Sequence, residues 1–357
     1  MVPLEAMTRA LDLASRGWGR VHPNPLVGAV ILKDGVIVGE GWHAEYGGPH
    51  AEAGALAQAG ASARGATVVV TLEPCAHHGK QPPCADALIA AGVSRVMAAL
   101  PDPNPAARGG AERLRSAGIE VELGLRQRAA AVQNAAFLHA LRDPSRPFVA
   151  LKLATSLDGR IADANGSSRW VSGPEARDYV HWLRAGFDAI AVGGVTARVD
   201  NPTLTVRGPL QPRVNPRRVV FAADADIPGG HTVVKTARSI PTMVIVAPGA
   251  EADRVGLLEA AGVEVFRSGD LAVSLAHLRS RGVESLLVEG GGRLAGALLA
   301  AGLVDRYYWI QSPLWLGAGA LPATAGLPST SLGEAPRWQV SDRRSLGEDT
   351  LLVVDRD

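Results

Sequence analysis

The sequence is poor in cysteine, in aromatic residues and in net charge. Its 357 residues include two cysteines, 4% aromatic residues and a formal net charge of +1. So few cysteines exclude a disulfide framework and are typical of a reducing compartment. A nearly neutral chain also argues against a surface that coats nucleic acid. The first 145 residues agree, because 13 Lys and Arg balance 13 Asp and Glu there.

Long hydrophobic runs are missing too. No segment approaches the roughly 20 apolar residues of a membrane helix. Residues 1–5 carry neither the basic region nor the apolar region of a secretory signal. The sequence therefore predicts a cytoplasmic protein without a membrane partner. At 357 residues, with 47% hydrophobic and 20% charged residues, it is long enough for two globular domains.

Both cysteines lie downstream of a His-x-Glu motif. His50, Cys75 and Cys84 are residue types that bind zinc, and Glu52 adds a separate carboxylate. Zinc deaminases use this pattern: three protein ligands leave one position for water, and the glutamate moves protons. Because zinc lowers the pKa of its bound water to about 7, hydroxide becomes available at neutral pH. The motif therefore predicts hydrolytic removal of an amine.

The spacing of the cysteines departs from the usual deaminase signature. They are separated by eight residues rather than two, and the insert contains His77 and His78. Either histidine could bind metal, so counting does not fix the ligand set. A lone histidine is usually a surface or satisfied core residue, and a lone cysteine is usually a small buried hydrophobe. We interpret His77 and His78 as structural or as support for the ligands.

Hydrophobic spacing predicts alternating strands and helices in the first half. The expected elements are a helix over 4–16, a hairpin turning at 33–35, a helix over 50–59, a strand over 67–71 and a helix over 84–91. Gly92 is expected to end the last helix. Cys75 and Cys84 are each expected at a helix N-terminus, where the dipole favours thiolate. This order predicts a three-layer α/β/α domain with the metal at the carboxyl ends of strands.

Prolines among polar residues predict a domain boundary over 143–147, after a helix over 126–141 that would act as a linker. Beyond the boundary we expect a mixed-sheet α/β domain. Its helix is expected over 174–184, and its strands over 148–154, 188–192, 218–221, 243–246, 263–266 and 285–288. Residues 307–311, 338–340 and 351–354 are expected to form an antiparallel finish.

A glycine-rich turn follows the strand expected over 285–288. Gly290, Gly291 and Gly292 would let a phosphate come close to the backbone at the start of a helix. The turn lacks both the spaced glycines of a dinucleotide fingerprint and the Walker lysine, so neither a Rossmann domain nor a P-loop kinase is supported. The residues alone indicate either a site for a cofactor phosphate or a tight turn.

Longer strings carry a family resemblance over nearly the whole chain. Residues 22–25, 41–43, 49–52, 71–80 and 82–84 resemble the deaminase half of bifunctional riboflavin-biosynthesis enzymes, and residues 151–160, 168–171, 200–207 and 289–292 resemble the reductase half. These enzymes join diaminohydroxyphosphoribosylaminopyrimidine deaminase to 5-amino-6-(5-phosphoribosylamino)uracil reductase. The long cysteine spacer matches this family and not the short-spacer nucleoside deaminases.

The resemblance implies a zinc-dependent, cytidine-deaminase-like domain over 1–145 and an NADPH-dependent, dihydrofolate-reductase-like domain over 146–357, in a homodimer or larger assembly. In the first domain, it implies that His50, Cys75 and Cys84 bind Zn²⁺ while Glu52 moves protons. The substrate would be 2,5-diamino-6-(5-phosphoribosylamino)pyrimidin-4-one. The residues implied to hold it are Asn24, His43, Lys80, Asp102 and Asn104.

In the second domain, the resemblance implies hydride transfer from NADPH to C1′ of the ribose, opened as an imine or aldehyde, which leaves a ribityl chain. The implied cofactor contacts are Ala154, Trp170, Thr196, Asp200, Gly291, Gly292, Arg293, Leu294, Ala295, Gly296 and Ala297. The implied substrate contacts are Ser168, Arg184, Leu204, Arg207 and Glu289. Arg293 stands where the family usually has Thr or Pro.

For three basic residues of this domain, side-chain chemistry also suggests a role, apart from the resemblance. Arg184 and Arg207 suit a phosphate, because a guanidinium binds phosphate with two parallel hydrogen bonds. Either alone is more often a solvated surface arginine. Lys152 is one of four lysines, and we expect it to polarise or protonate the reacting centre. The alternative is an ordinary lysine at a strand end.

Two other classes of function share part of this pattern. A nucleic-acid base editor uses the same metal chemistry but needs a basic, aromatic surface for single strands, which a charge-balanced, aromatic-poor chain does not offer. A non-catalytic zinc module usually has four protein ligands. A gel shift with single-stranded DNA tests the first class, and a search for an exchangeable water on the zinc tests the second.

Overall fold

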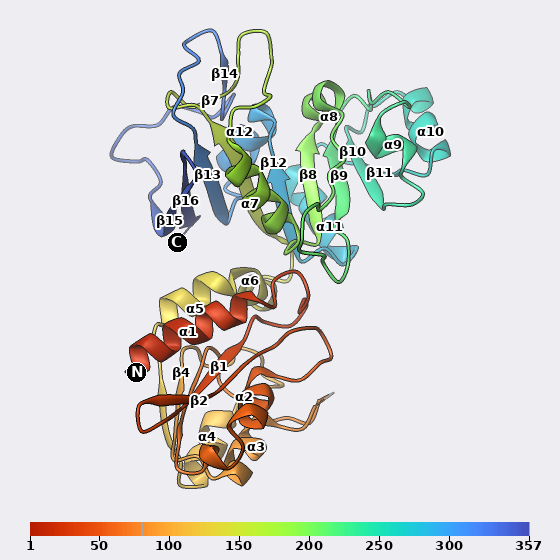
Figure 1. The fold of residues 1–357 in the computed structure, drawn as a ribbon. Coiled ribbons are helices and arrows are strands. Elements are labelled where there is room, and N and C mark those ends of the chain that lie inside the picture. Colours follow the sequence, from red (N-terminus) through yellow and green to blue (C-terminus); the bar gives the residue numbers. More distant parts are fainter. Residues whose placement is uncertain (80, 357) are drawn as a thin grey trace. The chain divides into compact units, whose positions relative to one another are not determined.

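The computed structural model describes residues 1–79 and 81–356, so Lys80, which the resemblance places at the substrate, lies outside the described residues. The chain divides into two compact units, Met1–Arg142 and Asp143–Asp357. Each unit has a sheet of its own, drawn from red to yellow for the first unit and from green to blue for the second (Figure 1). Within the described residues, no helix combines the length and apolar character needed to cross a membrane.

The first unit is built on a five-stranded sheet in the order β2-β1-β3-β4-β5. Its strands are β1 (Gly28–Lys33), β2 (Val36–Trp42), β3 (Thr67–Val70), β4 (Arg95–Ala98) and β5 (Glu120–Leu123). β1 is antiparallel to both β2 and β3, whereas β3, β4 and β5 run parallel. The predicted hairpin is confirmed, because Asp34 and Gly35 have positive φ angles of 50° and 77° that suit a two-residue hairpin turn.

Helices cover both faces of this sheet (Figure 1). One face carries α2 (Ala51–Ala59), the 3₁₀ turn Gly60–Ala63, α3 (Cys84–Ala91) and α4 (Gly110–Ser116), and the other carries α1 (Pro3–Ser15), α5 (Gln127–Gln133) and α6 (Ala135–Arg142). The predicted three-layer α/β/α arrangement is confirmed. Gly92 ends α3 in the left-handed conformation, with φ of 69°, also as predicted.

Close contact between α2 and β2 fixes where α2 begins. A Cβ at Gly41 of β2 would collide with the backbone carbonyl of Ala51, and one at Gly39 would collide with that of Ala55. Only glycine allows a helix and a strand to approach in this way. Since His50 immediately precedes α2 and Glu52 is its second residue, this packing holds both residues at one end of the sheet.

The single helix predicted over 126–141 is wrong, because α5 and α6 are separated at Asn134. This residue is 4% exposed, and its side chain satisfies both backbone groups of Leu26. The Leu26 amide donates to Asn134 Oδ1 at 2.8 Å, and Asn134 Nδ2 donates to the Leu26 carbonyl at 3.0 Å. Buried backbone groups need such partners. Ala130 and Leu138 pack into the core of the first unit, so these helices form a layer of the domain rather than a linker.

The second unit contains a nine-stranded sheet in the order β11-β10-β9-β8-β12-β6-β13-β16-β15. Its strands are β6 (Phe148–Thr155), β8 (Ala189–Gly193), β9 (Arg217–Phe221), β10 (Thr242–Val246), β11 (Glu264–Arg267), β12 (Ser285–Glu289), β13 (Arg306–Gln311), β15 (Trp338–Leu346) and β16 (Asp349–Arg356). A separate two-stranded sheet joins β7 (Arg160–Ala162) to β14 (Leu321–Pro322).

The expected antiparallel finish needs one correction. β13 is parallel to β6 and is therefore the last strand of the parallel part of the sheet. Its other neighbour is β16, with which it pairs antiparallel as predicted, and β16 in turn pairs antiparallel with β15. Both β15 and β16 are longer than predicted. The burial of β13 alternates residue by residue, and such a pattern also suits an antiparallel strand. The sequence pattern therefore could not reveal its direction.

Helices lie on both faces of the parallel part of this sheet. They are α7 (Pro174–Arg184), α8 (Gly194–Asp200), α9 (Thr232–Lys235), α10 (Ala252–Ala260), α11 (Leu271–Ser280) and α12 (Gly292–Ala300). One core cluster contains α11 and α12, and another contains α8, α9 and α10. Because β12 is parallel to both β6 and β8, the loops that follow these strands emerge at the same edge of the sheet.

Candidate active sites

Three potential zinc ligands converge in the first unit. His50, Cys75 and Cys84 each offer one ligand atom, and these atoms all lie within 4.8 Å of one another. His50 Nδ1 is 3.3 Å from the Cys84 sulfur and 3.6 Å from the Cys75 sulfur. Two sulfurs and one imidazole nitrogen make a donor set that suits Zn²⁺ and leaves a fourth tetrahedral position for a ligand from outside the protein. The side chains therefore fit the metal.

The three residues come from different elements. His50 is the N-cap residue of α2, and Cys84 is the first residue of α3. Cys75 follows β3 in an irregular segment, so the prediction of a helix N-terminus at Cys75 is wrong. Hydrogen bonds instead attach Cys75 to the start of α3. The Cys84 amide donates to the Cys75 sulfur at 3.4 Å, and the Ala85 amide donates to the Cys75 carbonyl at 3.2 Å.

The electrostatics of this cluster favour a thiolate at Cys75. A hydrogen bond from Cys84, and secondarily one with His50, lower the pKa of Cys75 to about 4 against the opposing effect of burial. The Cys75 sulfur in turn raises the pKa of His50. A thiolate is the form of cysteine that binds metal.

Glu52 lies beside the metal ligands but is not one of them. It is 4% exposed, and burial raises the pKa of its carboxyl group to about 7. Cys75 contributes to this rise, while His50 opposes it. A carboxyl group with a pKa near 7 can both accept and donate a proton at neutral pH. Glu52 thus has the environment of a general acid and base.

A cavity of about 260 Å³ opens beside these residues. His50, Glu52 and Cys75 line it together with four of the predicted substrate residues, Asn24, His43, Asp102 and Asn104. His77 also lines the cavity but does not belong to the metal-ligand group. The lining residues that sequence reasoning missed include Tyr46, Glu73 and Phe137.

Hydrogen bonds fix the orientation of His43 in the cavity wall. Its Nδ1 is 3.0 Å from the Pro49 carbonyl, which can only accept, so this nitrogen donates. Its Nε2 is 3.1 Å from the amide nitrogen of Asn24 and therefore accepts. Burial lowers the pKa of His43, which keeps the ring neutral. The pair turns the Asn24 side chain with its nitrogen toward His43.

In the second unit, Lys152, Arg184 and Glu289 form a buried charged cluster. Lys152 and Glu289 are paired neighbours on β6 and β12. Arg184, the last residue of α7, donates to the two carboxylate oxygens of Glu289 at 2.6 and 2.7 Å. Burial alone would raise the pKa of Glu289, but Arg184 and then Lys152 lower it to about 2. Burial lowers the pKa of Lys152, and the charge of Glu289 opposes this effect.

Arg184, which is predicted to contact the substrate, already has several partners within the protein. Its Nε and Nη2 are occupied by Glu289, and its Nη1 donates to the Thr205 carbonyl at 2.9 Å. Arg207 is exposed and contacts His181. Leu204 precedes the Thr205 carbonyl and is 2% exposed with a positive φ of 50°, a strained conformation for leucine. The segment that contains Leu204 and Thr205 therefore helps to hold the Arg184 side chain in place.

The glycine-rich turn meets α8 at this edge. A Cβ on Gly291 would lie 3.3 Å from Thr196 Oγ1, so these two predicted cofactor residues are neighbours. Gly290 and Gly291 have φ angles of 86° and 88°, which favour glycine. Ala154 lies on β6, paired with Ile310 of the adjacent strand.

Part of the turn expected at the cofactor is enclosed by the protein itself. Leu294 and Ala295 belong to the hydrophobic core. Cβ atoms on Gly292 and Gly296 would collide with the backbone carbonyls of Pro322 and Ala325. Among residues 291–297, Arg293 and Ala297 are exposed. If this turn lines the cofactor as predicted, we expect side-chain contacts mainly from the start of the turn and from the exposed positions.

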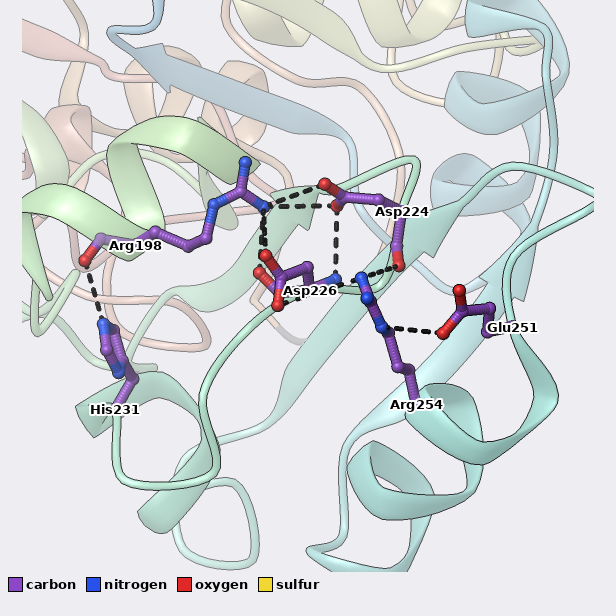
Figure 2. A network of polar contacts seen from close by, with 6 residues as sticks. All are labelled: Arg198, Asp224, Asp226, His231, Glu251 and Arg254. Carbon is purple, nitrogen blue, oxygen red and sulfur yellow. Dashed lines mark hydrogen bonds and ion pairs between the residues drawn. The ribbon is translucent and has the colours of Figure 1, made fainter.

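A polar network anchors the carboxyl end of α8 (Figure 2). Arg198 Nη1 lies 3.1 Å from Asp224 Oδ2 and donates to the Asp226 carbonyl at 2.9 Å. The Arg198 carbonyl lies 2.9 Å from His231 Nε2. Figure 2 shows Arg254 and Glu251 extending the network on the far side of Asp226. This network fixes the helix that carries Thr196 and Asp200.

The other predicted residues lie near α8. Ser168 and Arg169 interact with Asp200, since Ser168 hydrogen-bonds to its carboxylate and Arg169 Nη2 donates to its carbonyl at 2.6 Å. Trp170 is 67% exposed, with the guanidinium of Arg177 4.8 Å from its ring centre. An exposed tryptophan offers a flat apolar surface to a ligand.

The fold and the two sites define a class of protein, a zinc-binding, cytidine-deaminase-like domain followed by an α/β reductase domain. Family models agree with each half. The cytidine and deoxycytidylate deaminase zinc-binding region matches residues 3–100, and the RibD C-terminal domain matches residues 147–352. The second match covers more than half of the chain.

Whole-chain relatives identify the family. The riboflavin biosynthesis protein RibD of Escherichia coli K12 is 43% identical over 97% of each chain, and that of Aquifex aeolicus is 39% identical over 98% of this chain and 97% of its own. Form 1 of Acinetobacter baumannii RibD has a TM-score of 0.82 at 36% identity, covering 99% of this chain and 98% of that one. A deaminase/reductase of Thermotoga maritima has the same score and identity, covering 99% of both chains. The chain belongs to the RibD family of bifunctional deaminase–reductases in riboflavin biosynthesis.

This membership confirms the family resemblance, the fold class and the pairing of a zinc-binding deaminase domain with an NADPH-dependent reductase domain. The division of the structure falls between Arg142 and Asp143, three residues before the predicted boundary.

Proposed function

We propose that the first unit deaminates 2,5-diamino-6-(5-phosphoribosylamino)pyrimidin-4-one and that the second unit then reduces its ribosyl group to a ribityl chain with NADPH. One observation carries the first step: His50, Cys75 and Cys84 converge beside a separate buried acid in a single cavity. The Lys152–Glu289–Arg184 cluster, at the same sheet edge as the glycine-rich turn, supports the second step.

His50, Cys75 and Cys84 would hold the zinc, which when bound supplies a Lewis acid that lowers the pKa of water to about 7. Glu52 takes the proton of the attacking water and passes it to the departing amine. Its buried carboxyl group has a pKa of about 7, so both transfers are accessible at neutral pH. Asn24 and His43 orient the pyrimidine, while Asp102 and Asn104 line the other side of the same cavity.

In the second unit NADPH would supply the hydride, and the residues of the chain orient the substrate and carry charge. Lys152 polarises or protonates the reacting centre. Glu289 favours its ammonium form, whereas burial lowers its pKa and makes its proton easier to give. A Lys152→Ala variant should bind the substrate and transfer hydride more slowly. Hydride transfer at the parent rate would remove Lys152 from the mechanism.

The two steps can be tested in one experiment. Purified protein is incubated with the phosphoribosylated diaminopyrimidine, with and without NADPH, while ammonia and NADPH absorbance are followed separately. We expect ammonia in both samples and NADPH oxidation that depends on prior deamination. Zinc-loaded protein that releases no ammonia would refute the deaminase assignment.

We also propose that the protein works in the cytoplasm, as a homodimer or larger assembly, without binding nucleic acid. Cys75 and Cys84, its two cysteines, are free thiols, which suits a reducing compartment. Sedimentation of the purified chain tests the assembly, and a gel shift with single-stranded DNA tests the nucleic-acid prediction.

A further inference from the structure

Glu73 is a buried acid in the deaminase cavity that the mechanism above does not use. It is 7% exposed and follows β3, two residues before Cys75. We propose that Glu73 is a positioning residue, which holds the 101–111 loop so that Asp102 and Asn104 can bind the pyrimidine substrate. This inference rests on the proposed deaminase function and adds a residue that acts through the loop rather than on the substrate.

The carboxylate of Glu73 accepts hydrogen bonds from both ends of this loop. Its Oε2 accepts from the Asp102 amide at 3.0 Å. Its Oε1 accepts from the amides of Gly109 at 3.2 Å and Ala111 at 2.9 Å. A single side chain thus closes the loop at its entry and at its exit into α4. Hydrogen bonds to an ionised acceptor are about twice as strong as neutral ones.

The backbone around Glu73 adds to the same attachment. The Glu73 amide donates to the Leu100 carbonyl at 2.8 Å, and the Ala76 amide donates to the Ala107 carbonyl at 3.1 Å. A Cβ on Gly110 would collide with the Pro74 carbonyl, so the loop lies directly against the segment that carries Cys75.

Within the loop, two hydrogen bonds connect the anchored end to the predicted substrate residues. Asp102 Oδ1 accepts from the Asn104 amide at 2.9 Å, and Asn104 Oδ1 accepts from the Ala106 amide at 3.1 Å. These bonds make a rigid turn whose position depends on the anchored Asp102 amide. Because Asp102 and Asn104 line the cavity, a shift of this turn changes the substrate-binding wall. Glu52 and the zinc ligands lie on other segments, so the chemical step should be less affected.

Only a carboxylate meets the demands of this position. Three amide donors converge on two oxygens, and each oxygen can accept more than one hydrogen bond. In Glu73→Gln one oxygen is replaced by an NH₂ group, which would face an amide donor. At least one amide would then lose its partner in a buried site. The loop should move to restore hydrogen bonds with water.

The test compares Glu73→Gln with Glu112→Gln in zinc-loaded, full-length protein. Glu112 is exposed on α4, so its variant makes the same change of charge without touching the anchor. Ammonia release should show KM raised about tenfold or more in Glu73→Gln, with kcat within about threefold of the parent. Zinc content and the parent's reductase activity on deaminated substrate should be retained. Glu112→Gln should match the parent.

A double-mutant cycle with Asp102→Asn separates positioning from simple loss of stability. If Glu73 acts through this loop, Glu73→Gln should raise KM much less in the Asp102→Asn background than in the parent. An unchanged KM in Glu73→Gln, loss of zinc, or fully additive effects would overturn the proposal. Should Glu73→Gln be insoluble, Glu73→Asp replaces it in every comparison with the same criteria. A parent protein that never releases ammonia would instead refute the proposed function.

Discussion

Breaking the Arg184–Glu289 ion pair on one side should strongly destabilise the second unit. The side chains are 12% and 8% exposed and are joined by two short hydrogen bonds. Removing one partner leaves the other charge buried and unpaired, which costs about 3 to 5 kcal/mol. Arg184→Gln and Glu289→Gln should therefore both lower the free energy of unfolding by amounts in this range.

The two losses should differ because Lys152 neighbours the pair. Glu289→Gln leaves Arg184 and Lys152 as two cations without their carboxylate, whereas Arg184→Gln leaves Glu289 beside Lys152. Glu289→Gln should therefore be the more destabilising change. The double variant should lose less than the sum of the single variants, with a coupling energy of about 2 kcal/mol or more.

Urea unfolding followed by tryptophan fluorescence can measure these changes, because five of the seven tryptophans lie in the second unit. Arg344→Gln is the matched control: its ion pair with Asp342 is much more exposed, at 54% and 30%. Such pairs contribute about 1 kcal/mol or less. The reasoning fails if the Arg184 and Glu289 variants lose no more stability than this control.

Three further predictions concern pH, the α8 network and the packing of α2. The pKa of Glu289 is about 2 in the fold against an ordinary value of 4.5, which we take for the unfolded chain. About 3 kcal/mol of stability is therefore present above pH 4.5 and lost as the pH falls toward 2. Urea midpoints of Glu289→Gln should change less over this range than those of the parent. Arg198→Gln should raise KM for NADPH roughly five- to tenfold in steady-state assays, because α8 loses its anchor. Arg254→Gln, at the exposed side of the network, should leave this KM unchanged. Gly41→Ala should reduce stability by about 1 to 3 kcal/mol and lower zinc content, because its Cβ collides with α2. Gly54→Ala adds a Cβ that meets only ordinary contact at 3.5 Å, so it should keep the parent's stability and zinc content. Thermal unfolding and metal analysis measure these two properties.

Much of the first unit could be predicted because its signals are local. Asp34 and Gly35 define their own turn, and Gly92 ends α3. The His-x-Glu motif places His50 and Glu52 two residues apart at the start of α2. The break at Asn134 could not be predicted in this way. The Asn134 side chain satisfies the backbone of Leu26, a partner 108 residues away in the sequence, and no local sequence pattern indicates this contact.

Other features that the sequence does not reveal also depend on partners distant in the sequence. Arg184 suits a phosphate when considered alone, but the fold brings Glu289 against it from 105 residues away. Cys75 does not begin a helix of its own, because its sulfur and its carbonyl accept hydrogen bonds from the amides of Cys84 and Ala85 at the start of α3. Glu73 belongs to the same string as Cys75, yet only the fold shows its three amide partners.

The central claim is that the first unit combines three zinc ligands with an acid that does not bind the metal. Ammonia release and zinc content measured together on Glu52→Gln test it most directly. We predict a full complement of zinc and a loss of turnover of at least about a hundredfold. A variant that loses its zinc, or one that retains both zinc and the parent's turnover, would contradict the account.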